Sequence, residues 1–165
     1  GLWPEAIDAL THVAERGGDS RHKLTALFAL SNIYAHVLHK ELEAEKMLRR
    51  ALAINPRHPR ALRALLRSLD AKGNGRSDEA ASLLEELAVV ETDASLRPDY
   101  LLRAAETRES LGDRPRAEKA LIEVVASTPE RVEFFERLLA FYRREGGKHD
   151  EAGLARALSD RKSVV

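Results

Sequence analysis

The stretch YLLRAAETRESLGDRPRAEKALIEVVASTPE, residues 100–130, decides the fold class of this 165-residue chain. In its first half, apolar and small residues such as Leu101 and Ala105 recur at helical spacing until Gly112 breaks the pattern. The same spacing returns after the break and ends before Pro129. The stretch therefore predicts two helices joined by a tight turn.

Similar pairs of helical segments are predicted along the whole chain. The sustained alternation of apolar and polar residues that is typical of strands is missing. Turn-forming residues divide the chain into about nine segments of helical length. These breaks fall at Gly17-Gly18, His39-Lys40, Pro56, Gly73-Asn74-Gly75, Pro98, Gly112-Asp113, Pro129 and Gly146-Gly147.

A small residue opens the second helix of each predicted pair, where two helices cross closely. These residues are Ala6, Ala44, Ala80, Ala117 and Ala152, at spacings of 38, 36, 37 and 35. With Leu30, Ser31 and Tyr34 on a first helix and Pro56 after a second, the pattern resembles the tetratricopeptide repeat (TPR), a helix–turn–helix unit of about 34 residues.

The resemblance implies an all-α, right-handed α-solenoid in which first helices line a concave groove. The chain is then a single array over residues 1–165, with repeats at 20–58, 59–97, 98–131 and 132–160 and a tail at 161–165. Residues 1–19 match only the second half of a repeat, with Trp3 just before Ala6. We therefore expect a fragment of a larger repeat protein.

Composition limits the classes of partner. The chain has 27 Lys and Arg against 27 Asp and Glu, so a net charge of zero argues against nucleic acid or an anionic membrane. The absence of cysteine excludes disulfides, thiol catalysis and cysteine-bound zinc. No apolar run is long enough for membrane insertion. We expect a cytoplasmic protein, with the periplasm left open, and the abundance of Ala, Leu and Arg suggests a GC-rich bacterial source.

Three arginines are the main candidates for binding a partner. Arg60, Arg63 and Arg67 are spaced three and four apart, so they share one face of a predicted first helix. Leu62 and Leu65 should point into the core, which turns the arginines toward the groove. Guanidinium groups there could hold carboxylates of a peptide, often bidentately. The alternative is a solvated helix face whose ion pairs contribute little.

The same reasoning places residues of neighbouring first helices in the groove. These are Phe28, Asn32 and His36 before the arginines, and Leu102 and Arg103 after them. In chaperone-binding members of the family, a lysine would stand at Phe28 and an asparagine at Ala64. Because both are replaced, we do not expect binding of a chaperone tail.

Catalytic and metal sites are weakly indicated. His36 and His39, near Glu41 and Glu43, could ligate zinc, but no third ligand lies at a recognised spacing. The glycines around Asn74 join two helices instead of cradling phosphate. No serine lies in a nucleophile elbow. We therefore expect no cofactor, no bound metal and no enzyme activity.

Function is predicted from these observations and the implied shape. We expect a non-catalytic protein–protein interaction scaffold that binds a peptide or partner segment, with acidic groups, in its concave groove. A structural spacer or self-assembly element, stacking through its repeat ends, is the alternative. Catalysis or small-ligand sensing by another domain of a parent protein is a third reading. Bacterial members of the family serve secretion, pilus assembly, polysaccharide export and signalling complexes, and the sequence does not choose among them.

Overall fold

All regular structure in the described part of the chain is helical. The computed structural model describes residues 2–143 and Ser159. The first four helices are α1 (Trp3–Arg16), α2 (Ser20–Asn32), α3 (Glu41–Ile54) and α4 (Pro59–Ala71). The next four are α5 (Asp78–Val90), α6 (Arg97–Ser110), α7 (Arg114–Ser127) and α8 (Val132–Arg143). The predicted all-α class is confirmed, and the predicted ninth helix, around Ala152, lies outside the described residues.

Capping side chains explain where several helices begin. The carboxylate of Asp19 accepts a hydrogen bond from the backbone N–H of Arg21 (2.9 Å) and so caps α2. The Ser77 hydroxyl caps α5 in the same way, accepting from the N–H of Ala80 at 3.1 Å. Proline occupies the first turn of α1, α4, α6 and α7, where its missing N–H is no loss.

Glycines in the left-handed region end two of the helices. Gly73 and Gly112 both have a φ of 76°, which favours glycine over any residue with a Cβ. After Gly112 the chain folds back, and the N–H of Asp113 donates to the carbonyl of Arg108 at 2.9 Å. Such a bond satisfies a carbonyl that the end of α6 leaves without a helical partner.

A wide turn extends α2 beyond Asn32. Residues Ile33–Val37 form a π-helix, η1, in which the N–H of Leu38 donates to the carbonyl of Ile33 at 3.0 Å. His39 follows with a φ of 52°, a backbone conformation that is unfavourable for a residue other than glycine. The break predicted at His39-Lys40 is confirmed.

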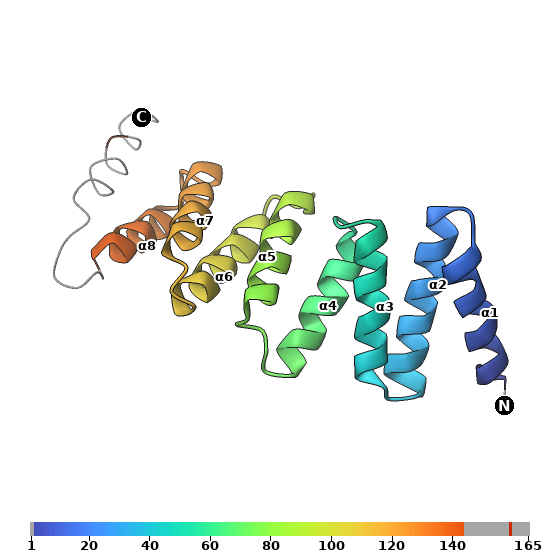
Figure 1. Cartoon of the computed structure of the whole chain (residues 1–165). Coiled ribbons are helices and arrows are strands. Elements are labelled where there is room, and N and C mark those ends of the chain that lie inside the picture. The colour runs from blue at the N-terminus through green and yellow to red at the C-terminus, as the bar shows by residue number, and fades with distance from the viewer. Residues whose placement is uncertain (1, 144–158, 160–165) are drawn as a thin grey trace. The chain divides into compact units, whose positions relative to one another are not determined.

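The described residues form two compact units that divide between Gly75 and Arg76. In unit 1, α1 packs on α2, α2 on α3 and α3 on α4; in unit 2 the same holds from α5 to α8. Within each unit, consecutive helices run antiparallel (Figure 1). The division falls inside the predicted repeat 59–97, so that α4 belongs to unit 1 and α5 to unit 2. The predicted repeat boundaries stay predictions.

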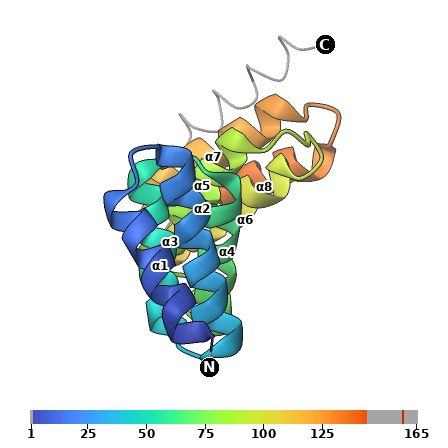
Figure 2. The same cartoon turned by 90° about the vertical axis from the view of Figure 1, so that its right-hand side faces the viewer.

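The core of unit 1 lies in the contacts between neighbouring helices. Leu27 and Leu30 of α2 are 1% exposed, and Ala51 of α3 is completely buried. They cluster with Ala14 of α1 and Ala61 of α4. In Figure 2, α1 lies nearest the viewer beside α2. Burial between neighbouring helices, pair after pair, is typical of helical-repeat proteins.

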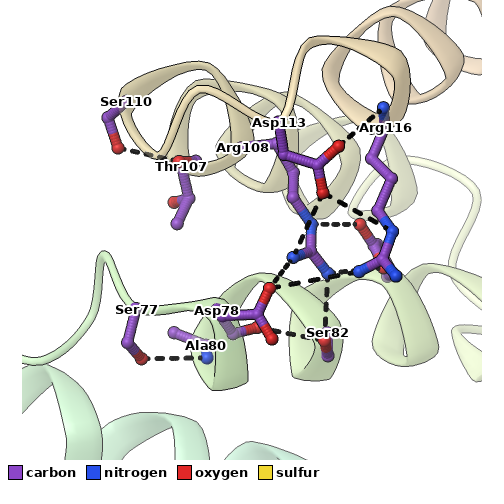
Figure 3. Close-up of polar contacts among 10 residues, drawn as sticks. Ser77, Asp78, Ala80, Ser82, Thr107, Arg108, Ser110, Asp113 and Arg116 are labelled. Carbon is purple, nitrogen blue, oxygen red and sulfur yellow. Dashed lines mark hydrogen bonds and ion pairs between the residues drawn. The ribbon is translucent and has the colours of Figure 1, made fainter.

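A buried arginine joins α5 to α6 in unit 2 (Figure 3). Arg108 is completely buried and donates to both carboxylate oxygens of Glu85, from Nε at 2.8 Å and Nη2 at 3.1 Å. Its guanidinium also donates to the Ser82 hydroxyl (3.0 Å) and to Asp78, and it lies 3.8 Å from a carboxylate oxygen of Asp113. These contacts tie α6 to α5 and to the start of α7.

In the part of the chain that the structure describes, no helix has the length and apolar character needed to cross a membrane.

Candidate functional site

The site that the structure indicates is a hollow in unit 1 between α2 and α4, both of which pack on α3. Its volume is about 170 Å³. Three residues of α2, one of α3 and four of α4 line it. They are Phe28, Ser31, Asn32, Leu48, Arg60, Arg63, Ala64 and Arg67. We call this concavity the α2–α4 hollow.

The face of α4 that meets the hollow is the one expected from the sequence. Leu62 and Leu65 are 2% and 1% exposed, so their predicted burial is confirmed. The three arginines, spaced three and four residues apart on the opposite face of α4, line the hollow. Arg60 and Arg67 are exposed, and Arg63 is half-buried. The structure thus brings Arg60, Arg63 and Arg67 together at one concavity.

A buried carboxylate fixes α4 against α3. Glu45 of α3 accepts hydrogen bonds from the Ser68 hydroxyl (2.6 Å) and from Nζ of Lys72 (2.5 Å), both at the end of α4. Arg49 donates to its other oxygen at 3.1 Å. Burial raises the pKa of Glu45, but the hydrogen bonds from Lys72, Ser68 and Arg49 outweigh it and bring the pKa below its ordinary 4.5. The ionised carboxylate therefore holds the two helices together.

An aromatic stack forms the wall that α2 contributes. The ring of Phe28 lies 4.8 Å from that of His58, with the two planes tilted by 44°. The guanidinium of Arg60 lies 5.7 Å from the centroid of the same Phe28 ring. This distance is within the range of a cation–π interaction. Phe28 thus supports a cation of α4 from the opposite side of the hollow.

The charge of the hollow is positive. Its lining includes three arginines, and none of the eight lining residues is Asp or Glu. Within residues 2–143, no carboxylate lies at ion-pair distance from Arg67, and the guanidinium of Arg60 faces the aromatic ring of Phe28. Guanidinium groups around an apolar wall can bind an anionic group together with an adjoining apolar side chain.

The structure does not bring all the predicted site residues together. His36 lies exposed in η1 and does not line the hollow. Leu102 and Arg103 belong to α6 of unit 2, where Leu102 packs against the buried cluster around Val124. Their predicted role in binding a partner therefore has no support from the hollow.

The corresponding face of α6 and α8 differs in its electrostatics. Arg137 of α8 donates to Glu106 of α6 at 3.1 Å, so cation and carboxylate neutralise each other within unit 2. By contrast, no Asp or Glu is among the residues that line the α2–α4 hollow.

Three lining residues were not predicted as site residues. Ser31 and Leu48 belong to the repeat pattern in the sequence, and Ala64 stands where chaperone-binding TPR proteins have an asparagine. In the sequence, the small side chain of Ala64 between Arg63 and Arg67 indicates a depression on this face of α4, because an alanine leaves space beside long arginine side chains.

The possible zinc site gains no further ligand. In the described ranges, no three His, Asp or Glu side chains gather where they could hold a metal ion. His36 and His39 are both exposed.

Comparison with known proteins gives a structural similarity and no family. By sequence, the chain matches no known protein family and no curated protein. Its structure is similar to the crystal structure of MamA protein, with 14% identical residues and a TM-score of 0.47. The match covers 96% of this chain and 93% of the other. With so few identical residues and this TM-score, the similarity assigns neither a family nor a function.

Proposed function

We propose that this chain is a non-catalytic protein-interaction scaffold of the TPR type, and that unit 1 binds a segment of a partner protein at the α2–α4 hollow. Consecutive antiparallel helices with small residues at their crossings support the TPR assignment. Such repeats present elongated surfaces to other proteins.

One observation carries the proposal. Five residues that spacing and the TPR resemblance together predicted for the groove, on two helices separated by α3, line the same concavity: Phe28, Asn32, Arg60, Arg63 and Arg67. Arginine and aromatic side chains are the types that contribute most to protein interfaces. The positive charge favours a partner segment with acidic groups, which would be attracted and oriented by these arginines.

The test is capture of partners from a lysate of the source organism, read by mass spectrometry. The wild-type chain is compared with the triple variant Arg60→Glu, Arg63→Glu and Arg67→Glu, after circular dichroism shows unchanged helicity and melting. We expect a partner that the wild type retains and the triple variant loses by at least tenfold.

A matched control distinguishes an effect of the arginines in the hollow from an effect of the changed net charge. Arg16, Arg50 and Arg76 are exposed and do not line the hollow, so changing them to Glu alters the net charge by the same amount. The control variant should keep the partner. Equal capture by all three proteins would place binding elsewhere and would refute the proposal.

Self-association is a second candidate, favoured by exposed apolar side chains at the start of α1. Leu2 is 82% exposed and Trp3 is 48% exposed. Stacking of copies through this helix would bury both side chains. Sedimentation velocity between about 1 and 100 µM would then show a mass that rises with concentration and falls back with Trp3→Ser. A monomer throughout would exclude this candidate.

A further inference from the structure

The size of the α2–α4 hollow limits what can enter it. Its volume is about 170 Å³. An apolar cavity of roughly 150 Å³ accommodates one benzene molecule. The hollow therefore takes a single side chain, of the size of leucine or phenylalanine, and not a whole turn of a partner helix.

Part of the lining of the hollow is apolar. Leu48 is 5% exposed, and Phe28 and Ala64 are half-buried. An apolar side chain in contact with these three residues would leave water, which favours its insertion. Ser31, 6% exposed, adds one hydroxyl to this lining.

The rim of the hollow is cationic over a defined length. Arg60 and Arg67 are seven residues apart on α4, so their Cα atoms are separated by about 10 Å along the helix axis at 1.5 Å per residue. An extended peptide advances about 3.3 Å per residue. About three residues of such a peptide therefore span the distance between the Cα atoms of Arg60 and Arg67.

We propose that the α2–α4 hollow binds an acidic peptide segment in which one apolar side chain enters the hollow and carboxylates within two positions on each side bind Arg60 and Arg67. This inference rests on the proposed function and names the partner chemistry of the same site. Carboxylates fit the rim because the planar guanidinium donates two parallel hydrogen bonds to them. The Phe28 ring, 5.7 Å from the Arg60 guanidinium, holds that donor over the hollow.

The experiment is a selection of peptides on the immobilised chain from a displayed library of random nine-residue sequences. We expect enrichment of Asp and Glu within two positions of a Leu, Ile, Met or Phe. The best peptide is then synthesised with a fluorescent label and titrated by anisotropy. Replacing its acidic residues with the corresponding amides, or its apolar residue with serine, should weaken binding at least tenfold.

A pair of variants tests the hollow itself. Ala64→Leu fills it without altering an arginine, and Ala53→Leu adds the same side chain at an exposed position of α3. The peptide should bind Ala64→Leu at least tenfold more weakly than Ala53→Leu. Circular dichroism and urea unfolding of both variants show that the fold is kept.

The outcomes separate this inference from the proposed function. Enriched peptides without the acidic and apolar pattern, or equal binding to both leucine variants, would refute the inference alone. If no peptide is enriched although a lysate partner depends on the arginines, the site recognises a folded surface and the peptide inference is wrong. If no peptide is enriched and no lysate partner depends on the arginines, the proposed function is refuted as well.

Discussion

The guanidinium of Arg60 on α4 lies 5.7 Å from the ring centroid of Phe28 on α2, across a hollow that both residues line. The ring face attracts the cation and leaves the donor edges of the guanidinium available to an anion. His58, just before α4, packs on the same ring at 4.8 Å. The aromatic stack and the cation therefore form one prearranged surface, which lowers the cost of ordering these side chains when a partner binds.

Replacing Arg108 with methionine should destabilise unit 2. Arg108→Met keeps an apolar stem but leaves Glu85 and Asp78 without the buried guanidinium that they share. Hydrogen bonds to charged groups contribute about 1.5–3 kcal/mol, and we expect a loss of about 2 because both carboxylates also reach solvent. Urea unfolding followed by circular dichroism measures the change.

Arg116 supplies the control for this prediction. It lies 3.5 Å from a carboxylate oxygen of Asp113, as an exposed ion pair. Arg116→Met should therefore change the free energy of unfolding by about 1 kcal/mol or less. Hydrogen exchange should place the Arg108→Met effect in α5 and α6. Equal losses for the two variants would show that burial of Arg108 contributes nothing.

Stability should depend on the ionisation of Glu45 in acid. Its pKa is lower in the folded chain than the ordinary 4.5, so ionised Glu45 stabilises the fold above about pH 4.5. That contribution is lost as the pH falls through the folded-state pKa. Glu45→Gln should cost about 1–3 kcal/mol at pH 7, because hydrogen bonds to a charged group are lost. The difference between wild type and variant should then shrink toward pH 3.

Urea unfolding at several pH values measures this difference. Glu41→Gln, at an exposed position of the same helix, is the control and should show no comparable pH-dependent difference from wild type. A Glu45→Gln penalty that stays constant from pH 7 to pH 3 would show that packing, and not the charge, is responsible.

Glycine at position 39 should stabilise unit 1. His39 has a φ of 52°, a left-handed conformation in which the Cβ of an L-residue is crowded. Glycine has no Cβ and adopts this conformation without that cost. His39→Gly should raise the free energy of unfolding by about 0.5–1 kcal/mol. His36→Gly, three residues earlier inside η1, should lower it by about 1 kcal/mol, because helical glycine costs backbone entropy. Destabilisation by both changes would contradict this explanation of the turn.

The orientation of α4 could be predicted because helical periodicity alone determines it. Once Leu62 and Leu65 face inward, Arg60, Arg63 and Arg67 must lie on the opposite side of their turns. The all-α class follows from the same periodicity.

The hollow itself could not be predicted from spacing. Its depth depends on Leu48 of α3 and on the small side chain of Ala64, which meet only after three helices have packed. The buried position of Arg108 is equally non-local, because its partners Asp78 and Glu85 lie 30 and 23 residues earlier. In the sequence, this arginine looks like any other charged residue on a helix.

Covalent trapping would locate a bound peptide. A peptide enriched by selection is synthesised with photo-leucine at its apolar position, bound to the chain and irradiated, and the attachment sites are mapped by mass spectrometry. Photo-leucine has nearly the shape of leucine and inserts only into atoms that it touches. We predict attachment to Phe28, Leu48 or Ala64, and its loss with Ala64→Leu. Attachment to α1 or to unit 2, unchanged by Ala64→Leu, would contradict binding at the α2–α4 hollow.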